Sequence, residues 1–229
     1  MENRTSAYEE VIELFDLLSN ILPQKVDGKN AILEMKNGGS TNWRQMEWIG
    51  FWFEFFVEKN LIPKLGGNSG PTFGTTRFDF KKKYVWDLKA HPVETKTLIL
   101  NDQIAFKECI RNQNGLGFII VSGQTTYDDA NRSFKKWHDQ LKGGTSSYEK
   151  DRVNRGAPSR RRKVSFSPMK LHSIWFDNLN EVETATKNGW LKSFQTGMRN
   201  SNSKPRPAKY MINLDDVPTS NLILEKSIN

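Results

Sequence analysis

The sequence RFDFKKKYVWDLKAH, residues 77–91, places charged residues inside two short apolar segments. Each segment carries one aspartate, Asp79 and Asp87, and Lys89 follows the second aspartate by two positions. The lysine run between the segments predicts a turn, and the segments on either side, residues 76–80 and 84–91, are predicted to be paired strands. Aspartate is depleted in strands. Two aspartates among large apolar side chains therefore indicate that this hairpin has a function.

Strand geometry predicts how these charged side chains are oriented. Successive residues of a strand face opposite sides of the sheet, so Asp87 and Lys89 share a face and lie about 7 Å apart along the strand. Asp79, on the preceding strand, comes alongside Asp87. Converging carboxylates repel one another unless a cation lies between them, and hard oxygen ligands suit Mg²⁺. A metal with a lysine beside it suits phosphodiester hydrolysis. The alternative is an ordinary exposed hairpin in which Lys89 pairs with one of the aspartates.

A second acidic feature lies upstream, in a segment that is apolar nearly all round and predicts a buried helix over residues 43–60. Seven residues of a helix return to within about 20° of the starting direction, and four more add about 40°. Glu47, Glu54 and Glu58 therefore share one face of this helix. One interpretation is a buried helix with a solvated stripe. The other is a stripe that faces a polar site, with Glu54 in its middle.

Helical and strand patterns alternate along the rest of the chain, which predicts the α/β class with a central mixed sheet flanked by helices. Loops are expected over residues 23–40 and 145–162. The other predicted elements are helices over 6–22, 101–115, 128–144 and 187–197, and strands over 116–123, 163–176 and 208–214.

Composition limits the class of protein. The 229 residues suit one domain spanning the whole chain, and a net charge of +8 favours a polyanionic partner such as nucleic acid. The single cysteine, Cys109, excludes an intrachain disulfide and a thiolate zinc cluster. The three histidines are dispersed, which argues against a zinc site. The longest apolar stretch, residues 48–57, is too short to span a bilayer, so we expect a soluble cytoplasmic protein.

Positive charge is concentrated in the C-terminal half. Residues 1–60 hold ten acidic and six basic residues, whereas residues 152–176 hold seven basic residues and no acidic one, and residues 184–214 hold six and none. Such segments suit phosphate contacts, and arginine suits bidentate contact with guanine. The alternative is solvated basic loops without specificity. The candidate DNA-binding residues are Arg155, Arg160, Arg161, Arg162, Lys163, Lys170, Arg199, Asn200, Asn202, Lys204 and Arg206.

The pattern D-(seven residues)-D-L-K, after a helix with an acidic residue and before a helix and an apolar strand, resembles the PD-(D/E)XK nuclease superfamily. That superfamily includes most type II restriction endonucleases. GFWFE, residues 50–54, followed by DLKAHPV, residues 87–93, is also similar to the pattern of the methyl-directed mismatch-repair nicking enzyme. The resemblance implies a restriction-endonuclease-like fold, with a catalytic core over about residues 41–123 and DNA-contacting elaborations over about residues 145–229.

The resemblance also implies roles for individual residues. Asp79, Asp87 and the backbone carbonyl of Leu88 would bind Mg²⁺, for which Mn²⁺ could substitute. Lys89 would position water and stabilise developing charge, and Glu54 would assist through a second metal ion or a water. Phe78 stands before the first aspartate, where the motif has proline.

Three residue assignments stay open at this level. The choice of Glu54 over Glu47 or Glu58 as the helix acid is one of them. His91 lies close to Lys89 along the strand, and Gln103 opens the next helix, where it is either a site residue or an ordinary polar residue of the first turn.

The expected function is that of a Mg²⁺-dependent type II restriction endonuclease, which makes double-strand cuts at a specific DNA site as a homodimer. The helix over residues 6–22 is a candidate dimer element. A repair or nicking endonuclease of the same fold is an alternative, and a DNA-binding protein without hydrolytic activity is another.

Overall fold

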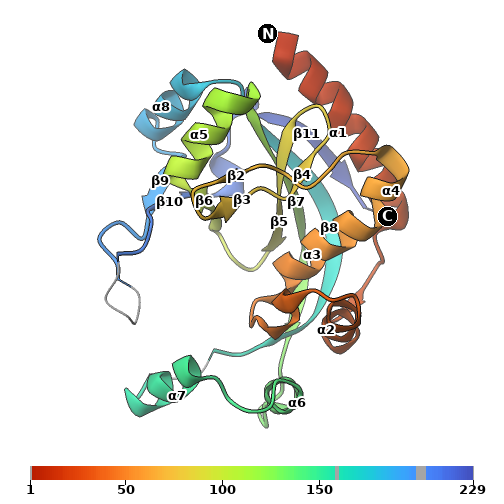
Figure 1. Cartoon of the computed structure of the whole chain (residues 1–229), viewed down its shortest axis with the longest axis vertical. Helices are drawn as coiled ribbons and strands as arrows, with labels where there is room; N and C mark the ends of the chain where they lie inside the picture. The colour runs from red at the N-terminus through yellow and green to blue at the C-terminus, as the bar shows by residue number, and fades with distance from the viewer. Residues whose placement is uncertain (1, 158–159, 200–204, 229) are drawn as a thin grey trace.

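The chain folds around a curled mixed β-sheet that helices flank on both faces (Figure 1), as a computed structural model of residues 2–157, 160–199 and 205–228 describes it. This confirms the predicted α/β class with a mixed sheet between helices. No helix in these three ranges is long and apolar enough to cross a membrane.

The main sheet brings together segments from the whole length of the chain. β5 and β7 are parallel, and the other neighbours are antiparallel. In sheet order the strands are β1 (Val26–Asp27), β8 (Lys163–Phe176), β7 (Leu116–Tyr127), β5 (Val85–Pro92) and β4 (Phe80–Lys81), while β11 (Leu222–Ser227) also pairs with β8.

The helices divide between the two faces of this sheet, each over its own cluster of buried apolar residues. One face is covered by α1 (Glu2–Ile21), α2 (Gly28–Asn37) and α3 (Trp48–Asn60). The other is covered by α5 (Gln103–Gln113) and α8 (Leu179–Lys187).

The remaining elements lie around this core. They are a three-stranded sheet of β6 (Leu98–Asp102), β10 (Lys209–Ile212) and β9 (Lys192–Phe194), a two-stranded sheet of β2 (Thr72–Phe73) and β3 (Thr76–Arg77), α4 (Ile62–Leu65), α6 (Ser133–Leu141), α7 (Ser147–Asn154) and the 3₁₀ helices η1 (Thr41–Arg44) and η2 (Leu214–Asp216). Figure 1 shows α6 and α7 below the sheet, apart from the other helices.

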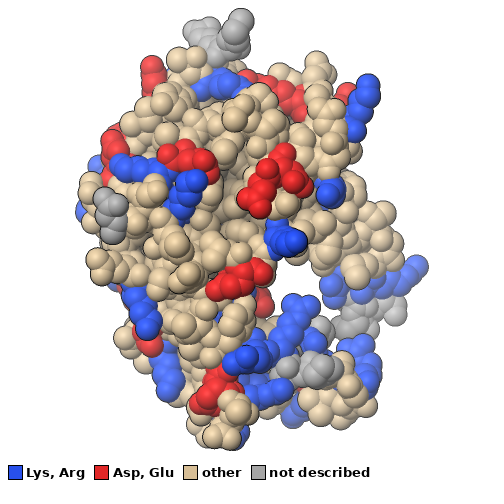
Figure 2. Space-filling view, turned by 180° about the vertical axis from the view of Figure 1, so that it is seen from behind, with Lys and Arg blue, Asp and Glu red and all other residues tan. Residues whose placement is uncertain are grey.

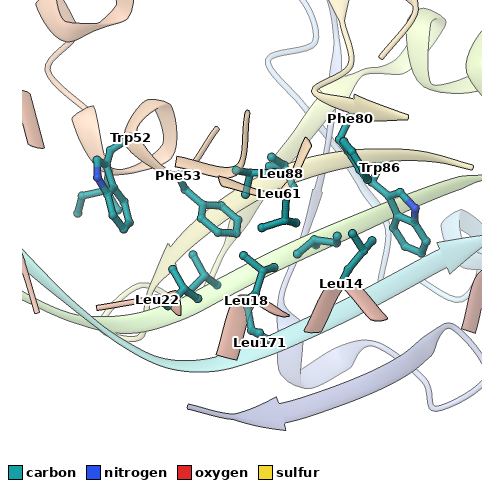
Figure 3. Close-up of a cluster of buried hydrophobic side chains, with 14 of the residues drawn as sticks. Leu14, Leu18, Leu22, Trp52, Phe53, Leu61, Phe80, Trp86, Leu88 and Leu171 are labelled. Atoms are coloured by element: carbon teal, nitrogen blue, oxygen red, sulfur yellow. The ribbon is translucent and has the colours of Figure 1, made fainter. Parts of the chain in front are cut away.

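Packing holds β5 firmly in place. Trp86 and Leu88 point into the cluster under α1 and α3, where Figure 3 shows them near Leu14 and Phe53. Trp86 is in register with Gly117 of β7, and a Cβ added at that glycine would come within 2.1 Å of the indole ring. The glycine therefore makes room for the indole directly over the neighbouring strand.

A buried carboxylate fixes the turn of the hairpin. Glu10 of α1 is 7% exposed and accepts hydrogen bonds from Trp86 Nε1 at 2.7 Å and from the backbone N–H of Lys83 at 3.0 Å. It also accepts a longer bond of 3.4 Å from the backbone N–H of Tyr84. This one side chain therefore ties α1 to the turn between β4 and β5.

Several element predictions are confirmed. The strand predicted over 163–176 is β8, the strand predicted over 208–214 is β10, and the helix predicted over 101–115 is α5. Asp102 caps α5, because its side chain accepts from the N–H groups of Ile104 and Ala105. The chain then leaves the helix through Asn114, which adopts the left-handed conformation with φ of 57°.

Both loop predictions are wrong, because each loop contains a capped helix. Residues 23–40 contain α2, which Asp27 caps by accepting from Asn30 N, and which buries Ala31, Ile32 and Met35. Residues 145–162 contain α7, whose cap Ser146 accepts from Glu149 N.

The helix predicted over 187–197 is also wrong. The helix lies earlier, as α8, and Gly189 then turns the chain with φ of 79°, so that residues 192–194 pair with β10 as strand β9. Pairing with a distant strand overrides the local helical pattern here. Strands β6 and β11 were not predicted.

Two boundaries differ at elements that matter for the site. The helix predicted over 43–60 begins only at Trp48, because residues 41–44 form η1 and the chain is extended at Gln45. The first strand of the hairpin, predicted over 76–80, pairs with β5 only through Phe80 and Lys81. Asp79 therefore precedes the strand instead of lying within it.

Candidate active site

Asp87 and Lys89 lie on the same face of β5, as the alternation of strand side chains predicted. Their neighbours Trp86 and Leu88 belong to the cluster on one face of the sheet, whereas Val85 belongs to the cluster on the other. The ammonium of Lys89 contacts Oδ2 of Asp87. Asp87 is only 2% exposed, so this ion pair is largely removed from water.

Asp79 reaches the site from the free edge of β5. Strand β4 pairs with β5 only at Val85 and Trp86, so the N–H of Leu88 lies beyond the end of that pairing. This N–H instead donates to the side chain of Asp79, at 2.7 Å from Leu88 N to Oδ2. This bond places the Asp79 carboxylate beside the backbone that joins Asp87 to Lys89.

Asn101 is a site residue that the sequence interpretation missed. It ends the apolar part of β6, is 8% exposed, and donates from Nδ2 to Oδ1 of Asp87 at 2.6 Å. The two oxygens of Asp87 are therefore engaged by different partners, Lys89 and Asn101. The neighbouring Asp102 caps α5. The one sequence feature that could have indicated Asn101 is its place at the end of the short apolar run of residues 98–100.

The structure distinguishes among the three glutamates of the α3 region. Glu47 precedes the helix, is exposed, and pairs with Lys163 at 2.6 Å. Glu58 is exposed near the end of the helix. Glu54 is partly buried, and its ionisation depends on the charges of Lys89 and Asp87. Of the three glutamates, Glu54 is therefore the one whose charge interacts with those of Asp87 and Lys89.

Burial and like charge shift the titration of the carboxylates at this site. Burial raises the pKa of Glu54 to about 7, with Asp87 adding to the shift and Lys89 opposing it. Burial, followed by the charge of Asp87, raises the pKa of Asp79 well above its usual range, although Lys89 and the Leu88 N–H oppose the shift. Burial disfavours the Lys89 ammonium, but Asp87 and Asp79 outweigh it and raise the pKa of the lysine. The site therefore holds more carboxylates than its single lysine neutralises.

Carboxylate oxygens are the kind of ligand that a hard divalent cation prefers. Within residues 2–157, 160–199 and 205–228, no group of three or more His, Cys, Asp and Glu side chains is arranged to hold a metal ion. The oxygens of Asp79 and Asp87 are instead engaged by Leu88 N, Asn101 and Lys89. Burial is the main cause of the raised pKa values of Asp79 and Glu54, and a cation among these oxygens would favour the ionised form of both carboxyls. A cation would compete with Lys89 for Asp87.

The same face of the sheet stays polar beyond Lys89. His91 is 6% exposed, and burial, followed by the charge of His172, lowers its pKa. His172 of β8 joins a hydrogen-bonded chain, with Ser122 Oγ at 2.8 Å from Nε2 and Glu225 Oε1 at 2.7 Å from Nδ1. These hydrogen bonds link the three neighbouring strands β7, β8 and β11, and His91 faces them from β5.

Gln103 is engaged away from Asp87. Its Nε2 donates to Ser193 Oγ at 2.8 Å and to the backbone carbonyl of Lys209 at 3.1 Å. The side chain therefore connects α5 to the three-stranded sheet, and in this arrangement it does not contact the catalytic candidates.

The candidate DNA-binding residues are placed in different ways. Arg155 and Arg160 are exposed. Arg161 is exposed but donates from Nη2 to the carbonyl of Asp128 at 2.7 Å. Arg162 is only 5% exposed, so it lies inside the fold and not on a surface loop.

The other candidates lie on β8 or in the last basic segment. Lys163 pairs with Glu47 at 2.6 Å and Lys170 with Glu225 at 2.9 Å. Arg199 is exposed, and Arg206 bonds through its backbone N–H to the carbonyl of Met198 at 2.8 Å. Asn200, Asn202 and Lys204 lie outside the described residues. Figure 2 shows Lys and Arg side chains gathered over the lower part of the molecule, with the surface hollowed between them and the main body.

Comparison with protein-family models, with curated proteins and with solved structures finds no match to this chain.

Proposed function

We propose that this protein is a Mg²⁺-dependent DNA endonuclease of the PD-(D/E)XK type, most closely like the type II restriction endonucleases. The observation that carries the proposal is the grouping on β5. Asp87 and Lys89 share one face, Asp79 binds the backbone between them, and Glu54 is electrostatically coupled to both. That combination of carboxylates and a lysine suits metal-assisted hydrolysis of a phosphodiester.

The order of elements around the site supports the same proposal. Helix α3 carries the acidic residue, β4 and β5 form the antiparallel hairpin, α5 follows, and β7 returns parallel to β5. This is the helix, hairpin, helix and strand order that the sequence motif implied. A restriction-endonuclease-like fold is part of the proposal.

The residues of the chain would divide the chemistry among them. Asp79, Asp87 and the carbonyl of Leu88 would hold the metal ion, which when bound polarises the phosphate and lowers the pKa of a water. Lys89 would hold the attacking water and offset the charge that builds on the phosphate. Glu54, whose pKa is raised to about 7 in the absence of metal, would assist through a second metal ion or by accepting a proton from that water near neutral pH.

Double-stranded DNA is the proposed substrate, and a homodimer is the proposed active form, since two sites acting together cut both strands of a duplex. The net charge of +8 supports a polyanionic substrate. Arg155 and Arg160 are exposed and suited to contact the backbone phosphates.

Incubation of supercoiled plasmid with the protein, with Mg²⁺ or with EDTA, tests the proposal. Discrete linear fragments that appear only with Mg²⁺ are the expected result. Nicked circles would instead identify a nicking enzyme, and retarded but intact DNA would identify a DNA-binding protein without hydrolysis. An Asp87→Asn protein prepared in the same way controls for a contaminating nuclease, because it should leave the plasmid intact.

A further inference from the structure

A cavity of about 460 Å³ lies at the base of the molecule, away from β5. Its walls come from the end of η1 and the residues after it, from the end of α6, from the start of α7, and from the chain entering β8. The polar side chains in these walls are Arg44, Gln45, Lys142, Ser146, Glu149 and Arg162. None of them belongs to the candidate active site.

Positive charge dominates this cavity, since three cations line it and Glu149 is the one carboxylate in its described walls. Lys142 already has a partner in Asp139, at 2.9 Å, outside the lining. Arg44 is exposed, donates from Nη2 to the backbone carbonyl of Lys142 at 3.0 Å and lies over the Trp43 ring at 5.0 Å, and both of these partners are uncharged. The cavity therefore offers a net positive field to a ligand.

Arg162 is the second, independent observation. Its side chain lines the cavity and is 5% exposed, and its Nη1 is out of contact with water and has no hydrogen-bond partner in the described part of the chain. A buried guanidinium nitrogen that lacks an acceptor costs free energy, because that N–H group has lost its water without a replacement. An oxyanion in the cavity would supply that acceptor.

The start of α7 adds a third contribution. Ser146 caps this eight-residue helix and also lines the cavity. The unpaired N–H groups and partial positive charge of a helix N-terminus favour an anion placed there.

We propose that this cavity binds a phosphate group, with Arg44 and Arg162 as its main ligands. Guanidinium groups match the geometry of phosphate oxygens through paired hydrogen bonds. The phosphate comes either from a nucleic-acid backbone or from free phosphate, since the recognised group is the same. The proposal uses no residue of the β5 site and stands whether or not the chain cuts DNA.

Calorimetric titration with inorganic phosphate, at constant ionic strength maintained with chloride, tests the site on the full chain. Saturable binding is expected. Arg44→Gln should weaken it at least about tenfold, the effect of one lost charge-assisted hydrogen bond. Lys136→Gln, an exposed lysine of α6 outside the cavity lining, removes the same charge nearby and should leave the affinity unchanged. Arg162→Gln should behave like Arg44→Gln. If the buried change prevents folding, the exposed Arg44 decides the test.

A second arm identifies the source of the phosphate. Binding of a DNA duplex in EDTA, which prevents cleavage, is measured for the wild type and for the Arg44→Gln and Lys136→Gln proteins. If the backbone fills the cavity, inorganic phosphate competes with DNA for the wild type, and Arg44→Gln weakens DNA binding more than Lys136→Gln does. If phosphate binds saturably without competing with DNA, the ligand is free phosphate. The proposal is overturned if phosphate shows no saturable binding, or if Arg44→Gln and Lys136→Gln weaken it equally.

Discussion

The ammonium of Lys89 contacts the carboxylate of Asp87, two residues earlier on the same face of β5. The lysine therefore neutralises a carboxylate that is 2% exposed and that no other cation in the described residues contacts. A metal ion at Asp87 must compete for the same oxygen. A substitution at Lys89 therefore distinguishes the proposed catalytic role of this ion pair from a purely structural one.

Replacing Lys89 by alanine tests the chemistry directly. If the lysine stabilises charge in the transition state, Lys89→Ala should lower the rate of plasmid cleavage at least about a hundredfold. DNA affinity should change little, because many phosphate contacts share the binding. Cleavage is followed by single-turnover kinetics and affinity by mobility shift in Ca²⁺. Lys96→Ala, an exposed lysine in the following loop, is the matched control. A folded Lys89→Ala protein that cuts at the wild-type rate would rule out the proposed role of the hairpin.

Asn101 should matter for both stability and activity because it donates to Oδ1 of Asp87 inside the fold. Asn101→Ala leaves that oxygen without its donor and should lower the free energy of unfolding by about 1–3 kcal/mol. Cleavage by the folded variant should also fall, since Asp87 loses one of its two anchors. Urea denaturation and cleavage assays measure the two effects. Asn112→Ala, which removes an exposed hydrogen bond within α5, should change neither the free energy of unfolding nor the cleavage rate. Equal losses in the two variants would contradict the positioning role of Asn101.

Stabilisation by Mg²⁺ should increase with pH. The pKa of Glu54 is raised from 4.5 to about 7 in the metal-free fold, so this carboxyl stabilises the fold at low pH and loses that contribution as the pH rises through about 7. A metal ion takes the place of the proton. The increase in Tm on adding Mg²⁺ should therefore be larger at about pH 8 than at about pH 6.

Glu54→Gln provides the matching variant for the metal prediction. It should reduce the Mg²⁺-dependent increase in Tm at high pH, because the titrating carboxylate is gone. Glu58→Gln changes an exposed glutamate of the same helix and should leave the increase intact. A Mg²⁺ effect that is independent of pH, or that is the same in both variants, would remove Glu54 from the metal site.

The exposed arginines should contribute to non-specific DNA affinity. Arg155→Ala with Arg160→Ala should reduce the slope of log affinity against log salt concentration by about two, since each phosphate contact contributes roughly 0.9. Fluorescence anisotropy at several salt concentrations measures the slope. Lys25→Ala with Lys64→Ala, both exposed on other parts of the surface, changes the net charge equally and should leave the slope near that of the wild type. Equal slopes for the two double variants would place the DNA elsewhere.

Glu10 should be important for stability without taking part in chemistry. It accepts from Trp86 Nε1 and from the N–H of Lys83, so Glu10→Ala leaves buried donors unpaired and should cost about 3 kcal/mol. The neighbouring Glu9 is exposed, and Glu9→Ala should stay within about 0.5 kcal/mol. Chemical denaturation compares the two. A cost at Glu10 no larger than at Glu9 would show that this contact does not anchor the hairpin.

Local patterns in the sequence determined several parts of this protein. The alternation of strand side chains placed Asp87 and Lys89 on one face, because that period belongs to the backbone of any strand. Local patterns likewise predicted the helix over 101–115 and the strand over 116–123, which the structure has as α5 and β7. These features depend on a few neighbouring residues, so they can be predicted without the rest of the chain.

Tertiary contacts decided what local patterns left open. Helix periodicity placed Glu47, Glu54 and Glu58 on one stripe, and only the start of α3 at Trp48 and its packing on β5 separate Glu54 from the others. Asn101 meets Asp87 through a contact between strands of two different sheets, and Arg162 is buried beside residues from the end of α6 and the start of α7. Burial and partner choice are properties of segments distant in sequence, and no local period encodes which of them will meet.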